Sequence, residues 1–227
     1  MQIRSPEPQQ TRTGRSLHAI ETDADIAEGL AALAASDPRL LPVIERAGPV
    51  PLRRSEPGFR GLANIIVAQQ ISKAAAASIW ARFETGLGTV SQDSVLAATE
   101  ADLRDCGLSR PKIRTLRAIA AACREGFDLD RLATLPAEDA IRTMTTLHGV
   151  GPWTAEVYLL FCLGHADIFP AGDLALIVAV GDALGHAERP DEKAVREIAS
   201  AWSPWRGVAA RLFWSYYAAT RREAAPL

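Results

Sequence analysis

A glycine-rich turn and an aspartate downstream of it hold the residue types that could do chemistry in this chain. Residues 147–155 read Leu-His-Gly-Val-Gly-Pro-Trp-Thr-Ala, and Asp173 follows after a mainly apolar stretch. Gly149 and Gly151 suit a tight turn and Pro152 suits the first position of a helix, so bare backbone amides there can bind a phosphate oxygen. A carboxylate among apolar neighbours is poorly solvated and can stabilise a developing positive charge. The pattern predicts a nucleic-acid-binding turn beside a reactive carboxylate.

The same aspartate has a purely structural interpretation. Asp173 precedes an apolar run that begins at Leu174, and aspartate is a preferred N-cap residue. Most aspartates at helix starts do only this. Both roles can hold together, because capping fixes the side chain in place.

The elements around these residues are predicted to be helical throughout. Apolar residues recur at helical spacing, and no segment alternates at the strand period, so the fold class is all-α. Asp25, Ser72 and Thr99 are expected to cap helices, Pro136 to open the helix before the glycine turn, and Gly164 to end the helix after it. The helices are expected at about 26–33, 38–47, 59–68, 73–83, 92–98, 100–106, 109–124, 137–147, 152–163, 174–184, 191–201 and 204–221.

Composition bounds the class of protein. The chain has 227 residues, of which 48% are hydrophobic, and this is ample for a core. Residues 1–16 are polar and predict a disordered tail without the apolar segment of a signal peptide, and no run is apolar enough to cross a bilayer. Three scattered cysteines and four histidines without ligand spacing suggest neither disulfides nor a metal cluster, so we expect a cytoplasmic protein.

Charge gives a mixed indication. The net charge of −2 is unusual for a protein that binds nucleic acid. A local basic group, formed by Arg110, Lys112, Arg114 and Arg117, can coexist with that total. This group is either a solvated helix face or a set of contacts to backbone phosphates.

Three segments in this order resemble the helix-hairpin-helix DNA glycosylases. They are the 147–155 turn with Asp173, the Ala-Gln-Gln-Ile-Ser segment at 68–72 and the Trp-Ser-Pro-Trp-Arg segment at 202–206. Within that superfamily the chain is most similar to the DNA-3-methyladenine glycosylase II branch, which acts on alkylated purines. The resemblance covers residues 37 to 219.

The resemblance implies an arrangement and a catalytic residue. It implies a helical barrel lobe with the hairpin at 58–165, a second helical lobe from 17–57 plus 166–227, and an active-site cleft between them. Asp173 is implied to be the catalytic residue, acting as a carboxylate. The flipped base is expected against a pocket formed by Trp153, Trp205, Tyr158 and Leu174.

The resemblance also implies contacts to DNA. Gln70, with Ile71 beside it, stands where the family carries the residue that fills the gap left by the flipped nucleotide. The hairpin contacts are expected at Gly149, Gly151 and Thr154. The backbone carbonyls of Thr145, Leu147 and Val150 match positions that hold a monovalent cation in the family, and no other cofactor is expected.

One residue of the hairpin indicates whether the expected glycosylase also cuts the DNA strand. Bifunctional family members carry a lysine at the position of Trp153, and that lysine attacks the sugar. The chain is therefore expected to be a monomeric, monofunctional glycosylase that removes alkylated purines such as 3-methyladenine and 7-methylguanine from double-stranded DNA, with no membrane partner. Two alternatives stay open: a glycosylase for a deaminated or mismatched base, and a non-catalytic DNA-binding protein. His148, Val157 and Leu174 depart from the family's usual pattern and leave the substrate range open.

Overall fold

The computed structural model describes residues 19–223, and within them every regular element is a helix, which confirms the all-α prediction. The predicted tail at 1–16 lies outside the described residues. No helix among the described residues is long and apolar enough to span a bilayer. The elements are α1 (Asp23–Ser36), η1 (Pro38–Leu40), α2 (Leu41–Ala47), α3 (Gly58–Ala68), α4 (Lys73–Leu87), α5 (Gln92–Ala97), α6 (Glu100–Asp105), α7 (Arg110–Arg124), η2 (Asp130–Thr134), α8 (Ala137–Met144), α9 (Pro152–Phe161), α10 (Leu174–Ala183), α11 (Glu192–Ser200) and α12 (Arg206–Glu223).

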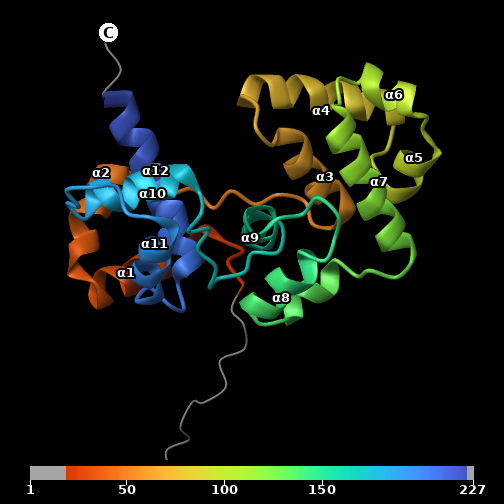
Figure 1. The fold of residues 1–227 in the computed structure, drawn as a ribbon. Coiled ribbons are helices and arrows are strands. Elements are labelled where there is room, and N and C mark those ends of the chain that lie inside the picture. Colours follow the sequence, from red (N-terminus) through yellow and green to blue (C-terminus); the bar gives the residue numbers. More distant parts are fainter. Residues whose placement is uncertain (1–18, 224–227) are drawn as a thin grey trace, which may run out of the picture.

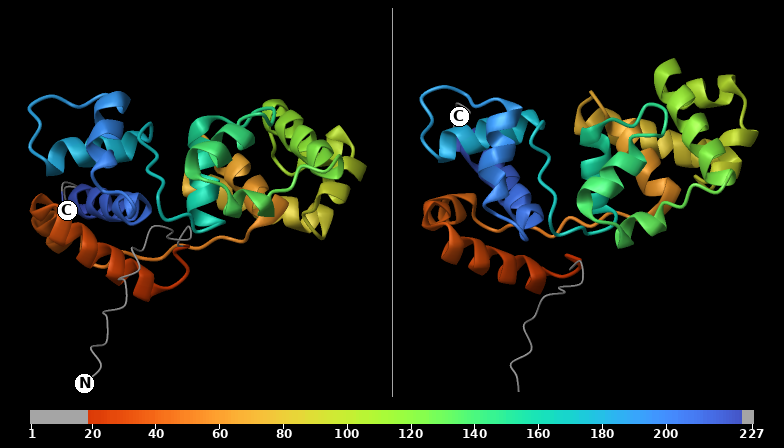
Figure 2. Two further views of the ribbon diagram at one scale, coloured as in Figure 1. Left: turned by 90° about the horizontal axis from the view of Figure 1, so that it is seen from below. Right: turned by 60° about the horizontal axis from the view of Figure 1, so that its bottom comes forward.

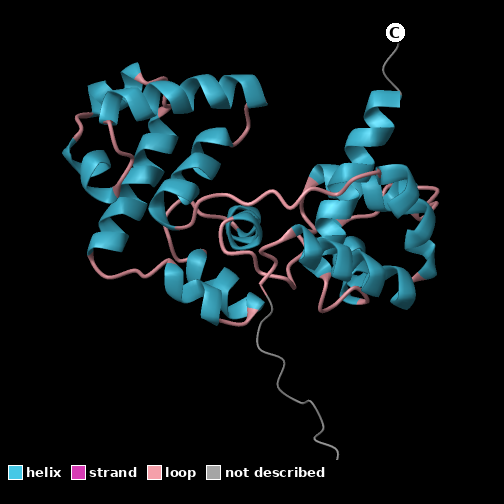
Figure 3. Cartoon of the chain, turned by 180° about the vertical axis from the view of Figure 1, so that it is seen from behind, coloured by secondary structure: helices cyan, strands magenta, loops and turns pink. Residues whose placement is uncertain are grey.

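The helices form two groups that lie side by side (Figure 1). In the first group α3 packs against α4, α7 and α9, and α8 packs against α9. In the second group α12 is central and contacts α1, α2, α10 and α11. Figure 2 shows that the first group comes from the middle of the sequence and the second from both ends. The chain crosses between the groups through the loop before α3 and the loop after α9, and Figure 3 shows both crossings as extended segments.

Several helices begin where the sequence predicts. Ser72 accepts from the amide of Ala75 and caps α4, and Thr99 caps α6. The prediction for α1 is wrong by one turn: Thr22 is the N-cap, and Asp25 completes a capping box by accepting from the Thr22 amide.

The helix after the glycine turn ends earlier than predicted. α9 stops at Phe161, whereas Gly164 lies in the following loop with a φ of +72°. The Gly164 carbonyl accepts from the amide of Ile20 at 2.7 Å, beside an isolated bridge between Ala19 and His165. Because residues 164–165 pair with the N-terminal segment, they cannot continue α9.

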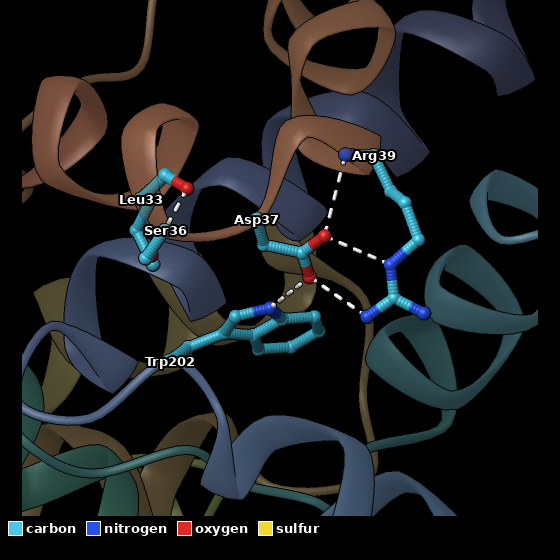
Figure 4. Close-up of polar contacts among 5 residues, drawn as sticks. All are labelled: Leu33, Ser36, Asp37, Arg39 and Trp202. Atoms are coloured by element: carbon cyan, nitrogen blue, oxygen red, sulfur yellow. Dashed lines mark hydrogen bonds and ion pairs between the residues drawn. The ribbon is translucent and has the colours of Figure 1, made fainter.

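The core of the second group is built on a buried tryptophan and an aspartate far apart in sequence (Figure 4). Trp202 is 1% exposed, and its indole Nε1 donates to Asp37 Oδ2 at 3.1 Å. Arg39 donates to both oxygens of the same carboxylate at 2.8 Å. Hydrogen bonds from Arg39, supplemented by the Trp202 indole, lower the pKa of Asp37 to about 2. This contact fastens the end of α1 to the segment before α12.

The buried guanidinium of Arg211 joins the two groups. Arg211 on α12 is 1% exposed and donates to the carbonyls of Leu52, Leu160 and Gly207, each at 2.9 Å. Burial lowers the pKa of Arg211 to about 10. Because Leu160 lies on α9 and Leu52 lies in the loop before α3, Arg211 fixes the end of α9 against α12.

Candidate active site

Asp173 lies at the start of α10 and caps it, as one of its two predicted roles requires. Its Oδ1 accepts from the amides of Ala175 at 3.0 Å and Leu176 at 3.1 Å. Its own amide donates to the carbonyl of Pro170 at 2.9 Å, which closes the turn before the helix. The carboxylate therefore has one orientation, set by the helix N-terminus, whose dipole also favours negative charge.

Two tryptophans from different helix groups donate to this carboxylate. Trp153, in the first turn of α9, donates from Nε1 to Asp173 Oδ2 at 2.8 Å. Trp214 on α12 donates from Nε1 to Asp173 Oδ1 at 3.2 Å. The Trp214 ring also packs against Phe161, with a centroid distance of 5.4 Å. The aspartate thus lies where α9, α10 and α12 meet.

The four donors leave one acceptor position of the Asp173 carboxylate open. A carboxylate has about four acceptor positions and no donor, and Asp173 receives four N–H groups. Three of them converge on Oδ1, and only one reaches Oδ2. Oδ2 therefore keeps room for one more donor, such as a water.

An apolar surface flanks the carboxylate. Trp153 is 37% exposed and Leu174 is 62% exposed, which makes both of them unusually open for large apolar side chains. Trp153 is hydrogen-bonded to Asp173, and Leu174 is its neighbour in sequence. A flat, electron-poor ring can stack here at little desolvation cost.

Two residues expected in the base pocket lie elsewhere. Trp205 is 6% exposed and packs inside the second group, where its ring fills the space beside Gly29 of α1. Tyr158 is fully buried, and its hydroxyl accepts from the amide of Gly58 at 3.0 Å. The structure brings Trp153 and Leu174 to Asp173 but not these two.

Trp214 is the site residue that sequence reasoning missed. It lies in the apolar central stretch of α12, where its type and spacing match those of core residues. The Trp-x-x-Trp-Arg segment attracted attention to Trp205 instead. An indole N–H that is withdrawn from water requires a hydrogen-bond acceptor, and this requirement indicates that Trp214 has a polar partner. No rule of sequence spacing identifies that partner as Asp173.

The predicted hairpin is present and leaves its amides open. Gly149 has a φ of +80°, and a Cβ there would lie 2.1 Å from Thr115 Oγ1, so both its conformation and its packing require glycine. Within residues 19–223, no protein group accepts from the backbone amides of Gly149, Gly151 or Trp153. These amides surround the N-terminus of α9 and form an anion-binding geometry.

The side chain of Thr154 is buried in the protein and does not face the surface where a DNA contact was predicted. Its side chain is 4% exposed, and its Oγ1 accepts from Gln69 Nε2 at 2.8 Å. Of this residue, only the backbone amide remains available to a phosphate. The threonine therefore connects α9 to the 69–71 segment, where Gln70 and Ile71 are both exposed.

The carbonyls expected to bind a cation share one turn. The Leu147 carbonyl accepts from the Val150 amide at 3.1 Å and keeps a second lone pair. Thr145 is the C-cap residue of α8, where helix carbonyls lack partners. A monovalent cation at Thr145, Leu147 and Val150 stays a prediction. No cluster of histidine, cysteine and acidic residues that could hold a metal occurs in the described part of the chain.

Two of the four residues in the basic group make hydrogen bonds inside the protein, and the other two lie on the surface. Arg117 donates to the carbonyl of Ala98, and Lys112 donates to two carbonyls at the end of α3. Arg110 pairs with Glu100 at 3.8 Å on the surface, and Arg114 is exposed. Half of the predicted basic face thus serves packing.

A second acid is buried near Asp173. Glu156 on α9 is 3% exposed and lies 3.8 Å from Arg196 on α11, which also binds Glu192. Burial raises the pKa of Glu156 to about 7, although the Arg196 charge opposes this shift. Glu156 makes no hydrogen bond to Asp173 in the described structure.

Comparison with protein families gives one match that covers most of the chain. Residues 63–204 match the model described as the HhH-GPD superfamily base excision DNA repair protein. Two relatives illustrate the range of lengths. The alkylbase DNA glycosidase-like protein mag2 of Schizosaccharomyces pombe is 24% identical over 85% of this chain and 94% of its own length. A probable bifunctional transcriptional activator/DNA repair enzyme AlkA of Mycobacterium tuberculosis is 29% identical over 90% of this chain, which spans only 42% of that protein.

Two solved structures share the fold closely. The DNA-3-methyladenine glycosidase of Bacillus halodurans has a TM-score of 0.76 and 28% identity over 91% of this chain and 94% of its own. The 3-methyladenine DNA glycosylase Mag1 of Schizosaccharomyces pombe, solved in complex with abasic DNA, has a TM-score of 0.74 and 25% identity, covering 82% and 95% of the two chains.

Proposed function

Because the chain belongs to the HhH-GPD superfamily of base excision DNA repair proteins, we propose that it is a monofunctional DNA glycosylase that removes alkylated purines from duplex DNA. The expected substrates are 3-methyladenine and 7-methylguanine. The observation that carries the proposal is the carboxylate of Asp173, held by two indoles beside an exposed apolar surface. The names of the relatives from Bacillus halodurans and Schizosaccharomyces pombe support the choice of substrate class.

Binding would begin at the hairpin. A backbone phosphate accepts from the open amides of Gly149, Gly151 and Trp153, which position the duplex without reading its sequence. Gln70 enters the base stack as the damaged nucleotide leaves it, which offsets part of the extrusion cost. All the groups gathered around Asp173 come from one chain, so a monomer suffices.

Recognition would rest on charge and stacking. A purine nucleotide alkylated at ring nitrogen N3 or N7 carries a positive charge, and the exposed face of Trp153 attracts such a ring. The Trp214 and Trp153 N–H groups are already bonded to Asp173, so they do not select among neutral bases through hydrogen bonds. This arrangement favours cationic lesions over deaminated ones.

Bond cleavage would use Asp173 as an anion. The C1′–N bond breaks with its electron pair moving to the base, which neutralises the positive purine, so no acid is needed. The sugar becomes oxocarbenium-like, and the fixed carboxylate stabilises that charge. Oδ2 accepts a hydrogen bond from the attacking water, whose oxygen bonds to C1′ and whose proton leaves to solvent.

The product would be an abasic site with an intact strand. Strand cleavage by a glycosylase requires an amine that attacks the sugar. The chain has lysines at 73, 112 and 193, on α4, α7 and α11, and none on α9 or α10. Trp153 occupies the hairpin position that would carry such a lysine.

The test is base release from methylated duplex DNA by wild type, Asp173→Asn and Asp191→Asn. Asp191 caps α11 through the Ala194 amide, and asparagine caps helices as well as aspartate does, so both variants should fold. Asp173→Asn should lose at least about a hundredfold in single-turnover rate, while Asp191→Asn keeps the wild-type rate.

Treatment of the products with alkali distinguishes the alternatives. Strand breaks that appear only after alkali indicate a monofunctional enzyme. Near-wild-type release by a folded Asp173→Asn variant would contradict the mechanism. Salt-sensitive binding without release of any methylated base would favour the non-catalytic protein, and release only from deaminated or mismatched DNA would favour the other lesion class.

A further inference from the structure

The segment that carries Gln70 has an unusual backbone conformation. Gln70 has a φ of +59°, in the left-handed region that non-glycine residues seldom adopt. It directly follows Gln69, the C-cap residue of α3, whose amide bonds to the Ile66 carbonyl at a long 3.4 Å. An exposed turn of this kind persists only when contacts outside it enforce the geometry.

Lys112 supplies such contacts from a neighbouring helix. Its Nζ donates to the carbonyl of Val67 at 2.7 Å and to the carbonyl of Gln69 at 2.9 Å. Among the described residues no carboxylate forms an ion pair with Lys112, so its charge faces the carbonyls at the C-terminal end of α3. Burial lowers the pKa of this ammonium group, in keeping with its half-buried place.

The second of these bonds acts directly on Gln70. The Gln69 carbonyl belongs to the peptide unit that joins Gln69 to Gln70. Because that unit is planar, fixing the direction of its C=O also fixes the N–H of Gln70 and sets ψ of Gln69. Since α3 and α4 hold the chain on either side of the turn, φ of Gln70 is then restricted as well. Lys112 therefore constrains the dihedral angle that is strained.

The side chain of Gln69 ties the same segment to the active site. Gln69 Nε2 donates to Thr154 Oγ1 at 2.8 Å, and Thr154 adjoins Trp153, whose indole binds Asp173. The segment is thus held at its backbone by α7 and at its side chain by α9.

We propose that Lys112 is a positioning residue that holds the Gln69–Gln70 peptide so that Gln70 points out for insertion into the DNA duplex. This proposal rests on the proposed function, which makes Gln70 the inserting residue. It assigns Lys112 a role inside the protein, in place of the phosphate contact that its basic neighbours suggest.

The experiment is a double-mutant cycle between Lys112→Met and Gln70→Ala, with Arg124→Met as the matched control. Arg124 lies in the last turn of the same helix, is exposed, and pairs only loosely with Asp93 at 3.8 Å on the surface. Insertion is measured without catalysis, by the fluorescence of 2-aminopurine placed opposite an abasic-site analogue in a duplex. Excision of methylated purines is measured separately under single-turnover conditions.

If Lys112 acts through Gln70, Lys112→Met should reduce insertion and excision by roughly tenfold in the wild-type background but by less than about twofold in the Gln70→Ala background. Lys112→Arg, which can donate to the same two carbonyls, should restore most of both signals. Arg124→Met should leave the insertion signal unchanged.

Several outcomes would overturn the proposal. Equal losses in both backgrounds indicate an independent role, and a reduced salt dependence of binding for Lys112→Met indicates a phosphate contact. If the wild-type protein inserts Gln70 into the duplex but does not excise methylated purines, the proposed function fails. The insertion measurements of the double-mutant cycle then still test the role of Lys112. If wild type does not insert, the proposal about Lys112 fails. If Lys112→Met melts more than a few degrees below wild type, Lys112→Gln replaces it in the cycle.

Discussion

The Trp214 indole donates to the same Asp173 oxygen that caps α10, across 41 positions of sequence. One carboxylate oxygen therefore serves the helix and the active site together, while Trp153 holds the other oxygen. This sharing explains how an aspartate at an ordinary helix start acquires a fixed orientation, because α9, α10 and α12 all contribute donors to its carboxylate. Loss of either indole should loosen it without unfolding α10.

Trp214→Phe should reduce the single-turnover rate of methylated-purine release by roughly ten- to a hundredfold, because a hydrogen bond to a charged group contributes about 1.5–3 kcal/mol. Phenylalanine keeps the packing against Phe161. The matched control is Trp80→Phe, which changes a half-buried tryptophan on α4 and should leave the rate unchanged. An unaltered rate for Trp214→Phe would mean that the indole does not hold Asp173 during the reaction.

Gly149→Ala should destabilise the protein by at least about 2 kcal/mol, since it places a side chain at positive φ and against Thr115. Gly151→Ala is the control, because Gly151 has an extended backbone and open space around its Cβ position. Urea unfolding midpoints measure both. Similar midpoints for the two variants would show that the hairpin tolerates a side chain at position 149.

Glu156→Gln should stabilise the protein increasingly as pH rises. The pKa of Glu156 is about 7 in the folded protein and 4.5 in its ordinary state, so the folded protein favours the protonated form. Wild-type stability is therefore lost as pH rises from about 4.5 to 7, whereas the variant does not titrate there. The stability difference should grow by up to roughly 3 kcal/mol between pH 4 and pH 8.

Denaturant midpoints across that pH range test this prediction. Glu197→Gln on α11 is the control, because Glu197 is exposed and water solvates its charge in both states. A difference between wild type and Glu156→Gln that stays constant with pH would contradict the buried-charge explanation.

Asp37→Asn should destabilise the second helix group by about 2 kcal/mol at neutral pH, because it removes the charge that Arg39 and Trp202 bind. The pKa of Asp37 is lowered to about 2, so this contribution is present above pH 3.8 and is lost as pH falls toward 2. The thermal midpoint of the variant should therefore lie well below that of wild type at pH 7 and much closer to it at pH 2.5, where about a third of the contribution remains. Asp93→Asn, at an exposed position, serves as control.

Local chemistry made much of the fold predictable. The caps at Ser72 and Thr99 and the glycine hairpin depend on residues within a few positions of each other, and each is found where expected. The capping role of Asp173 is of the same kind. These features need no knowledge of what packs against them.

The missed parts of the site depend on contacts that no spacing rule encodes. Trp205 directly precedes α12 and Trp214 lies within it, and both have the same residue type. Only the packing of α12 places Trp214 against Asp173 and Trp205 against Gly29. Similarly, the sequence predicts a DNA contact at Thr154 and leaves Lys112 open between a solvated position and a phosphate contact, whereas the structure turns both side chains toward the 69–71 segment. Long-range packing, which sequence periodicity cannot supply, assigns these roles.

The two indoles at Asp173 also make the site spectroscopically visible. The chain has five tryptophans, and Trp153 and Trp214 are the pair bonded to the carboxylate, one of them open to solvent and the other partly covered. A purine that stacks on Trp153 would quench its emission and shift the polarity around it, while Trp202 in the core stays a constant background. The protein thus carries an intrinsic optical reporter at the place where the chemistry is proposed, so occupancy of the site can be followed on unlabelled protein.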